Sequence, residues 1–394
     1  MFEGDGPPGL RPERLLRLMR RSLDETAPDL RGATVLTEAA TGAYAVTPVI
    51  AALAGADHVY AVTRSTRYGS AAEVMKGTMS LAEAAGVADR ITVHAEPDPA
   101  TRFELLGAAD VVTNSGHLRP LDAASVAALR PTAVVPLMFE AWEVDLGRED
   151  IDLAALRERG VRFSGTDERH PAVDVFGYLG AMAVRLLEDA QTAVRHSRIA
   201  LLCDNPFAPY LESGLVAAGA TVRAASSPDD LDRCLADGAE PDAVVVALSP
   251  TGRPVLGRQE LERLADRCPG VLLAQFWGDL DREVCARVGL PCAPAAPPAP
   301  GHMGVLPSAV GPEPIVRLQA GGIKVASVLR KDPRTWTEAD RQWLDDPQVP
   351  ECSGGSWPTA ASGVPGPAAA SGVPEGAGRA GGRWGAGASG GGAA

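Results

Sequence analysis

The sequence predicts an α/β protein with two doubly wound parallel sheets, and three observations lead to this prediction. Short runs of Val, Ile, Leu and Ala recur along the chain without polar alternation, which is typical of strands buried on both faces. Ala- and Leu-rich segments with helical spacing separate these runs, and such alternation indicates a parallel sheet. The pattern stops near residue 170 and starts again near residue 198, and a chain of 394 residues has room for two domains.

Residues 1–30 hold a predicted N-terminal amphipathic helix. Leu15, Leu16, Met19 and Leu23 are spaced to form an apolar face among arginines. We expect the apolar face to pack on the first domain and the arginines to stay in water.

Residues 31–170 are predicted to form the first Rossmann-like domain. Its strands are the apolar runs 33–37, 59–63, 91–95, 110–114, 133–138 and 161–165. Helical spacing between them occurs at 47–55, 70–86 and 122–130.

A long linking helix is predicted over 171–196, and a second Rossmann-like domain that ends in a closing helix over 197–335. The strands of the second domain are the runs 198–203, 221–225, 242–248, 270–276 and a last apolar piece at 288–293. The closing helix falls near 320–329. Two such domains form a cleft between them, and interdomain clefts are a preferred place for small-molecule sites.

Residues 353–394 are predicted to be a disordered C-terminal tail. Gly, Ala, Ser and Pro make up 34 of these 42 positions. Such a segment buries too little apolar surface to offset the conformational entropy lost on folding.

The charge and hydropathy of the chain limit its partners. Lys and Arg number 37 against 50 Asp and Glu, so the formal net charge is −13, whereas broad nucleic-acid binding needs a positive field. The sequence has no apolar stretch of about 18 residues for a membrane span and no apolar core of a secretory signal near its start. We therefore expect a cytoplasmic protein that binds a small-molecule substrate, with no nucleic-acid or membrane partner. A homodimer stays an open hypothesis.

The six cysteines show no CxxC and no paired short spacing. We therefore expect reduced thiols and no metal site.

Polar residues follow most strands of the first domain. They include Glu38, Arg64, Asn114, Glu140 and His170. Ligands of parallel sheets bind outside the carboxyl ends of the strands, where helix N-termini point at them. This edge is therefore the predicted small-molecule site.

Two turns at this edge indicate a nucleotide. After the first strand, Glu38 leads through Thr41 and Gly42 into a helix, and the small residues let backbone N–H groups approach a phosphate. With one glycine this turn is a weak match to the three-glycine dinucleotide motif, and tight strand–helix packing explains it equally well. After the second strand, arginines and hydroxyls suit a 2′-phosphate, so NADP is favoured over NAD. The predicted cofactor-binding residues are Glu38, Thr41, Gly42, Arg64, Ser65, Arg67 and Asn114.

Residues 85–93, Ala-Gly-Val-Ala-Asp-Arg-Ile-Thr-Val, resemble the corresponding stretch of class I methyltransferases. This resemblance implies S-adenosylmethionine as the cofactor and keeps a methyltransferase open as an alternative.

A second resemblance begins near the end of the first domain. Residues 150–155 (Asp-Ile-Asp-Leu-Ala-Ala), 158–161 (Glu-Arg-Gly-Val) and 166–168 (Thr-Asp-Glu) resemble the end of the substrate domain in D-isomer-specific 2-hydroxyacid dehydrogenases, such as formate and glycerate dehydrogenases. Residues 300–304, Pro-Gly-His-Met-Gly, resemble the loop with the family's catalytic histidine. The resemblance implies an NAD(P)-dependent oxidoreductase that acts on a small hydroxy or oxo acid, with His302 as general acid and base.

The chain departs from that family at two places. Residues 203–210, Cys-Asp-Asn-Pro-Phe-Ala-Pro-Tyr, replace the Gly-rich turn, and Phe276-Trp277-Gly278-Asp279 lacks the substrate-binding arginine. A non-catalytic nucleotide- or metabolite-binding protein of Rossmann architecture is therefore the other alternative.

The candidate catalytic residues are His302, His170 and Glu140. Imidazole titrates near neutral pH and suits general acid–base work. Pro171 favours the first turn of the linking helix, which places His170 at its positive N-terminal end. Glu140 supplies a carboxylate after the fifth strand, and His117 is a further candidate.

Overall fold

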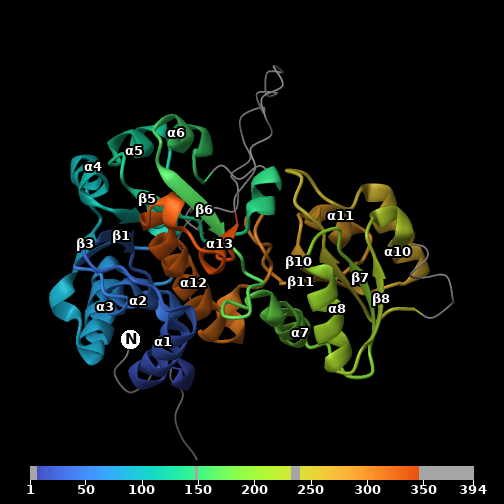
Figure 1. Ribbon diagram of the computed structural model, residues 1–394. Helices are drawn as coiled ribbons and strands as arrows, with labels where there is room; N and C mark the ends of the chain where they lie inside the picture. Colours follow the sequence, from blue (N-terminus) through green and yellow to red (C-terminus); the bar gives the residue numbers. More distant parts are fainter. Residues whose placement is uncertain (1–6, 147–149, 232–239, 346–394) are drawn as a thin grey trace, which may run out of the picture.

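The computed structural model describes residues 7–146, 150–231 and 240–345, which form two sheets with helices on both faces (Figure 1). The predicted tail 353–394 lies outside the described residues. Within the described residues, no helix is both long enough and apolar enough to cross a membrane.

The first sheet has six parallel strands and one short antiparallel edge strand. The strands are β1 (Thr34–Glu38), β2 (His58–Thr63), β3 (Ile91–Ala95), β4 (Val111–Val112), β5 (Val134–Pro136), β6 (Arg162–Thr166) and the edge strand β12 (Leu344–Asp345). They lie in the order β12-β6-β5-β4-β1-β2-β3. Without β12 this is the order 3-2-1-4-5-6 of dinucleotide-binding sheets, whose ligand crevice lies where the order reverses. The switch point here is between β1 and β4.

Helices cover both faces of the first sheet. They include α1 (Pro12–Thr26), α2 (Val46–Leu53), α3 (Ala71–Ala85), α4 (Pro99–Ala108), α5 (Ala123–Ala128) and α6 (Leu153–Glu158). A capping box of Ser70 and Glu73 starts α3, and Asp98, Asp122 and Asp152 cap α4, α5 and α6. Neighbouring strand residues face opposite cores, because Val35 lies in one apolar cluster and Leu36 in another.

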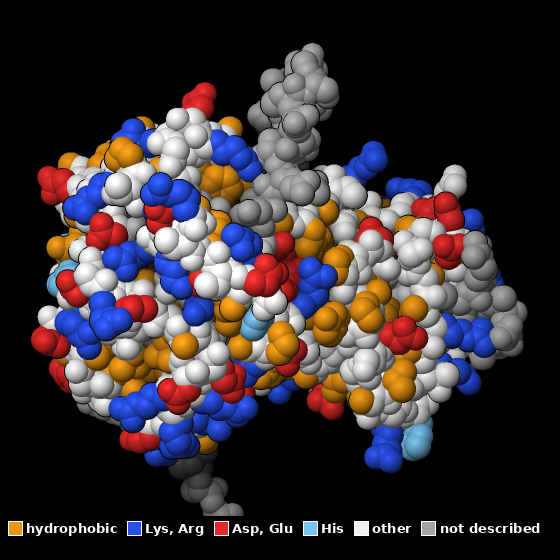
Figure 2. Space-filling view, viewed as in Figure 1, with side chains coloured by type: hydrophobic (Ala, Val, Ile, Leu, Met, Phe, Trp, Pro, Cys, Tyr) orange, Lys and Arg blue, Asp and Glu red, His pale blue; other side chains and the backbone are white. Residues whose placement is uncertain are grey.

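The predicted N-terminal helix is α1, and its two faces lie as the sequence predicts. Leu15 and Met19 are buried, whereas Arg14, Arg17 and Arg20 are exposed. Figure 2 shows Lys and Arg side chains gathered at the foot of the first domain, where Figure 1 draws α1.

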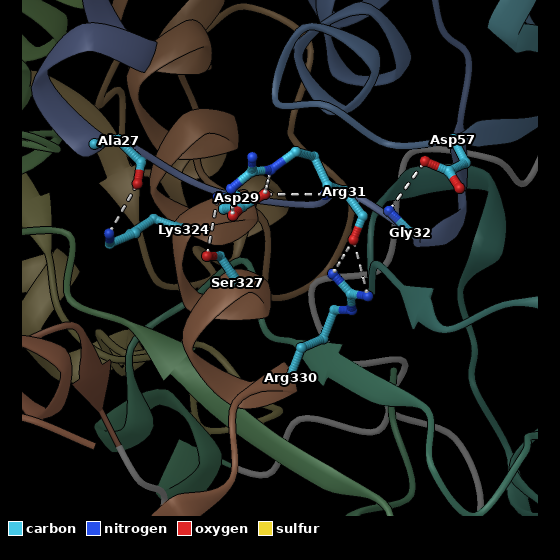
Figure 3. A network of polar contacts seen from close by, with 8 residues as sticks. All are labelled: Ala27, Asp29, Arg31, Gly32, Asp57, Lys324, Ser327 and Arg330. Carbon is cyan, nitrogen blue, oxygen red and sulfur yellow. Dashed lines mark hydrogen bonds and ion pairs between the residues drawn. The ribbon is translucent and has the colours of Figure 1, made fainter. Parts of the chain in front are cut away.

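The closing helix α12 (Glu313–Arg330) packs on the first sheet, although the sequence analysis grouped it with the second domain. It is apolar almost all round, which is typical of a helix buried in a large core. Its C-terminal half is tied to the segment after α1 (Figure 3): Lys324 Nζ donates to the Ala27 carbonyl at 3.0 Å, and the Asp29 N–H donates to Ser327 Oγ at 3.0 Å. The chain therefore leaves the first domain after β6 and returns to it.

The linking segment contains a shorter helix than the 171–196 predicted. The helix α7 spans Leu179–Asp189 and follows a 3₁₀ turn at Phe176–Tyr178. Before it, Asp174 has a φ of 43° and Val175 N–H donates back to the Glu168 carbonyl. Because a left-handed residue interrupts a right-handed helix, the first turns cannot be helical.

The second sheet has five parallel strands. They are β7 (Arg198–Leu202), β8 (Thr221–Ala225), β9 (Ala243–Ala247), β10 (Leu272–Trp277) and β11 (Cys292–Ala293), in the order β11-β10-β9-β7-β8. This is the flavodoxin-like order 2-1-3-4-5, with its switch point between β7 and β9. The helices α8 (Ala208–Ala217), α10 (Arg258–Arg267) and α11 (Arg282–Arg287) lie around it (Figure 1).

Candidate functional site

The strongest candidate site lies at the switch point of the first sheet. Glu38 is the last residue of β1, and its carboxylate reaches the loop after β4, where Oε2 accepts a hydrogen bond from the His117 N–H at 3.1 Å. Gly116 makes room for it, since a Cβ at Gly116 would lie 1.5 Å from Glu38 Oε2. The glycine is therefore needed to let this carboxylate occupy the switch point.

Buried hydroxyl groups join the two strand ends beneath Glu38. Thr113 Oγ1 lies 2.8 Å from Thr37 Oγ1 and 2.7 Å from Ser115 Oγ. All three residues are buried. These hydrogen bonds hold the ends of β1 and β4 together and make the floor of the site polar.

Two buried polar atoms at the site lack a partner within the part of the chain that the structure describes. Asn114 is fully buried, and its Oδ1 accepts a hydrogen bond from the Met138 N–H at 2.7 Å, whereas its Nδ2 is unpartnered. His117 Nδ1 is unpartnered as well. An unmade buried hydrogen bond costs roughly 1–3 kcal/mol, so each of these atoms is one that a bound water or ligand would satisfy.

Burial and neighbouring charges set the protonation of the site. Burial, together with the positive charge of Arg64, lowers the pKa of His117 to about 4. Burial raises the pKa of Glu38, against the lowering effects of the His117 N–H and of Arg119. The imidazole is therefore neutral at pH 7, and the carboxylate binds a proton more readily than usual.

Tyr44 connects the site to the loop that returns from the second domain. Burial, together with the charge of Glu38, raises the pKa of Tyr44 to about 12, so its hydroxyl stays protonated. The hydroxyl lies close enough to Ser308, in the 3₁₀ turn Pro307–Val310, for Ser308 to lower that pKa in part. The loop 299–312 therefore lies against the first domain at Tyr44.

The other predicted cofactor residues lie around this site. Thr41 and Gly42 form the turn after β1, and Gly42 has a φ of 63° that favours glycine. Arg64 is exposed at the end of β2, close enough to His117 to act on its pKa. Arg67 contacts Tyr68, with Nη2 2.6 Å from the Tyr68 hydroxyl.

Ser65 reveals a residue that the sequence analysis missed. Its hydroxyl and its N–H both donate to Glu96 Oε1, at 2.8 and 3.2 Å. These hydrogen bonds lower the pKa of Glu96, so its carboxylate is ionised at neutral pH. Glu96 follows β3 with a φ of 49°, and its N–H donates to the Thr63 carbonyl. A carboxylate from the end of β3 therefore lies against the end of β2, which has no acidic residue of its own.

Glu140 and His170 belong to a second polar group, at the ends of β5 and β6. Glu140 is fully buried; Oε1 accepts from the Glu168 N–H and from Arg169 Nε, both at 3.0 Å, and Oε2 accepts from Trp142 Nε1 at 2.8 Å. Burial raises the pKa of Glu140 to about 7, although Arg169 lowers it. These hydrogen bonds favour a positioning role for Glu140 over contact with a substrate.

The ring of His170 stacks on Trp343 beside the edge strand β12, with centroids 3.9 Å apart. Its Nδ1 accepts a hydrogen bond from the Ala172 N–H at 3.1 Å. The predicted residues at the strand ends thus form two groups, one around Glu38 and Asn114 and one around Glu140.

His302 is half-buried in the loop that follows the second sheet. On its N-terminal side, the Gly301 carbonyl accepts from Trp277 Nε1 at 3.0 Å, and the Gly301 N–H donates to Asp279 at 2.9 Å. This anchors the base of the loop to the end of β10. His302 and Ser308 therefore lie on one segment between the two domains.

The switch point of the second sheet is bridged by protein groups. Asn205 Nδ2 donates to the Ala247 carbonyl at 2.7 Å, and Asp204 Oδ1 accepts from the Ser249 N–H at 2.8 Å. The Phe207 ring lies beside Trp277 and Trp142, with centroids 5.2 and 5.7 Å away. As the sequence predicts from residues 203–210, this end of the sheet offers no Gly-rich turn to a pyrophosphate.

Among the described residues, no group of three or more His, Cys, Asp and Glu side chains is placed to hold a metal ion.

No protein-family model matches the chain, and no curated protein is similar to it in sequence. Several solved structures are similar. A dipicolinate synthase chain from Bacillus halodurans matches with a TM-score of 0.47 and 12% identity, over 77% of this chain and 99% of that protein. The pyruvate reductase of Chlamydomonas reinhardtii matches with a TM-score of 0.43 and 14% identity, over 76% and 96% of the two chains.

The NAD⁺-bound 3-phosphoglycerate dehydrogenase of Entamoeba histolytica is similar with a TM-score of 0.39 and 8% identity, over 74% of this chain and 93% of that protein. A reductase and a dehydrogenase are thus among the structures that this chain is similar to.

Proposed function

We propose that the chain is a nicotinamide-dependent oxidoreductase whose cofactor binds at the switch point of the first sheet. The observation that carries the proposal is the strand order 3-2-1-4-5-6 with Glu38, Asn114 and His117 at its reversal. In open α/β sheets the ligand crevice lies at that reversal. The second sheet is the weaker candidate, because its switch point is bridged by Asn205 and Asp204.

The residues at this switch point fit a dinucleotide. The turn after β1 has small residues and a left-handed Gly42, so its backbone can approach a phosphate closely. Burial raises the pKa of Glu38, and the easier protonation weakens the repulsion that an ionised carboxylate would exert on a pyrophosphate. The unpartnered Asn114 Nδ2 is a buried donor that a ligand oxygen would satisfy.

The ionised Glu96 bears on the choice of cofactor. Its carboxylate lies against Ser65 at the end of β2, which is the ribose-binding position of such sheets. A carboxylate there accepts hydrogen bonds from ribose hydroxyls and repels a 2′-phosphate. Glu96 therefore favours NAD, against the NADP that Arg64 and Arg67 suggest from the sequence.

A bound nicotinamide would supply hydride transfer, and the chain itself must supply the proton. His302 is the proposed acid and base for a hydroxyl or carbonyl group, since its loop also carries Ser308, which contacts Tyr44 beside the site. Tyr44, whose hydroxyl stays protonated, can donate a hydrogen bond to the same substrate. The substrate proposed is a small hydroxy or oxo acid.

Binding experiments test the proposal. Isothermal calorimetry of the full chain with NAD⁺, NADH, NADP⁺ and NADPH should show saturable binding, tighter for the unphosphorylated pair. Glu96→Gln should reduce the difference in affinity between the unphosphorylated and the 2′-phosphorylated nucleotides. His117→Leu should weaken the binding of all four nucleotides. Asn205→Ala is the matched control, because it changes the other switch point. Absence of binding by all four nucleotides would refute the cofactor assignment.

An S-adenosylmethionine-dependent methyltransferase is the second candidate. The observation that favours it is Glu38 at the end of β1, because the cationic amino and sulfonium groups of that cofactor would stabilise the ionised form of this carboxyl group. S-adenosylhomocysteine in the same calorimeter separates the two candidates. Binding of S-adenosylhomocysteine together with no binding of NAD⁺ or NADH would favour the methyltransferase.

A further inference from the structure

The edge of the second sheet holds two cysteines that the proposed function does not use. Cys285 lies in α11 and is buried, and Cys292 begins the edge strand β11. Both thiols are reduced in the structure. Figure 1 shows α11 and β11 in the second domain.

The chain path between these cysteines brings them together. Gly289 has a φ of 79°, so the chain reverses after α11, and the Leu290 N–H donates to the Cys285 carbonyl at 2.9 Å. Cys292 packs with Cys285 and Leu290 in one apolar cluster, while its neighbour Ala293 lies in the cluster on the opposite face. Cys292 Sγ lies 3.7 Å from the Leu290 carbonyl oxygen, and the two thiols lie close enough for each to shift the pKa of the other.

A guanidinium group lies beside the pair. Arg282, one turn before Cys285 on α11, lies close enough to Cys292 for its positive charge to lower the pKa of that thiol. It is held there by the Gln275 side chain, with Nη2 2.6 Å from Oε1, and by the Pro294 carbonyl, 3.0 Å from Nη1. A fixed positive charge next to a thiol stabilises the thiolate.

The two cysteines differ in reactivity. The neighbouring Cys285 thiol and the positive charge of Arg282 lower the pKa of Cys292, whereas the neighbouring Cys292 thiol and burial raise the pKa of Cys285. Cys292 is only partly buried. The pair thus combines a partly accessible, thiolate-forming cysteine with a second cysteine in contact, an arrangement typical of peroxide-sensitive thiols.

We propose that Cys285 and Cys292 form a reversible disulfide in response to hydrogen peroxide. The Cys292 thiolate attacks the peroxide, the O–O bond breaks, and sulfenic acid and hydroxide form. The Cys285 sulfur then attacks the sulfenic sulfur, which releases the second oxygen as water once protonated. One peroxide is reduced to two waters, and two thiols are oxidised to one disulfide. A dithiol such as dithiothreitol reverses the step by exchange.

The disulfide would act on the loop that carries His302. It would fix α11 to β11, and Arg282 already connects α11 to Gln275 and Pro294. Gln275 packs next to that loop, because its carbonyl leaves room only for a glycine at Gly304. Oxidation at the sheet edge would therefore shift the backbone at Gly304, two residues from His302. This effect does not depend on which reaction the first-sheet site performs.

Peptide mapping of the full chain tests the proposal. Trypsin cuts after Arg282, Arg287 and Arg317, so Cys285 and Cys292 fall in separate peptides, 283–287 and 288–317. After peroxide treatment and blocking of free thiols, mass spectrometry should find the two peptides linked, with two hydrogens lost. Dithiothreitol should restore both free peptides.

Two variants and two internal controls complete the test. Cys285→Ser should abolish the linked pair and leave Cys292 to oxidise further, to sulfinic acid, and Arg282→Gln should slow the loss of the Cys292 thiol. Cys203 and Cys268 are buried, and burial raises the pKa of both, so they should stay reduced in the same sample. Cys292 oxidised alone in the unaltered chain, or Cys203 oxidised as fast as Cys292, would overturn the proposal.

Discussion

The only two asparagines of the chain lie at the switch points of the two sheets, and their environments differ. Asn205 in the second sheet uses both ends of its amide: Oδ1 accepts from the Phe207 N–H, and Nδ2 donates to the Ala247 carbonyl. Asn114 in the first sheet uses Oδ1 and leaves Nδ2 unpartnered among the described residues. The same residue type therefore completes a structure at one switch point and offers a donor at the other.

The titratable and apolar groups around the two switch points differ as well. Glu38, Tyr44 and His117 at the first switch point all have shifted pKa values, mainly because they are buried. Apolar rings, Phe207 and Trp277 among them, cover the second. Perturbed titratable groups cluster at functional sites, whereas satisfied polar groups under aromatic rings are typical of a core. This comparison supports the proposal that a ligand binds at the first switch point, and it indicates a structural role for the second.

The largest expected effect is a loss of stability on truncating the rings over the second sheet. Phe207→Ala removes a ring whose centroid lies within 5.2–6.4 Å of those of Phe176, Phe276 and Trp277. We expect a loss of about 3–5 kcal/mol in the free energy of unfolding, measured by urea titration. Phe103→Ala, at a ring that is 41% exposed, is the control and should cost less than about 0.5 kcal/mol. Equal losses for both would break the comparison.

The second prediction concerns the bridge between β7 and β9. Asn205→Ala leaves the Ala247 carbonyl and the Phe207 N–H without their partner. Urea titration should show a loss of about 2 kcal/mol, with the affinity for the nucleotide unchanged. Weaker nucleotide binding in the folded variant would mean that the second switch point also takes part in binding.

The third prediction concerns Glu140 and the pH dependence of the free energy of unfolding. The pKa of Glu140 is raised to about 7 in the folded chain, mainly by burial, so the folded state binds the proton more tightly than the unfolded state does. Its stabilising contribution is complete below the unfolded pKa near 4.5 and is lost as the pH rises through 7, about 1.4 kcal/mol per unit of pKa difference.

Glu140→Gln should remove this pH dependence from the free energy of unfolding between pH 4.5 and 7. An unchanged slope in the variant would show that Glu140 is not the titrating group.

The smallest expected change in stability is at the first switch point. His117→Leu removes the unpartnered Nδ1 and keeps the backbone N–H that donates to Glu38. Its free energy of unfolding should therefore stay within about 0.5 kcal/mol of the unaltered value, while nucleotide affinity falls. A large loss of stability with full nucleotide affinity would reverse the roles assigned to the two sheets.

Much of the fold is predictable from the sequence because the strands are apolar runs buried on both faces. All eleven parallel strands coincide with predicted runs, whereas the edge strand β12, two residues long, gives no periodic signal. The linking helix begins later than the predicted residue 171. The left-handed conformation of Asp174 prevents an earlier start, and no apolar pattern in the sequence marks such a residue. The place of α12 depends on contacts between residues nearly 300 positions apart, which no local pattern contains.

The sequence predicts those residues of the candidate site that directly follow a strand. Glu38 and Asn114 follow from the rule that ligands meet the carboxyl ends of parallel strands, and the structure brings them to one switch point. Glu96 escapes that rule because the ribose acid is expected after β2, whereas this carboxylate reaches the same position from β3. Tyr44 escapes it because its partner Ser308 lies in a distant loop.

The return of α12 to the first sheet has a consequence for how the chain is made. The apolar face of β5 and β6 stays uncovered until residues 313–330 have been synthesised. Arg317 donates a hydrogen bond to the Pro171 carbonyl at 2.8 Å, across 146 positions of the sequence. During synthesis the domain of the second sheet, which is inserted between β6 and α12, is therefore complete before the first domain has its last helix. Nascent chains should therefore bury the inserted domain first, an order opposite to the order of translation.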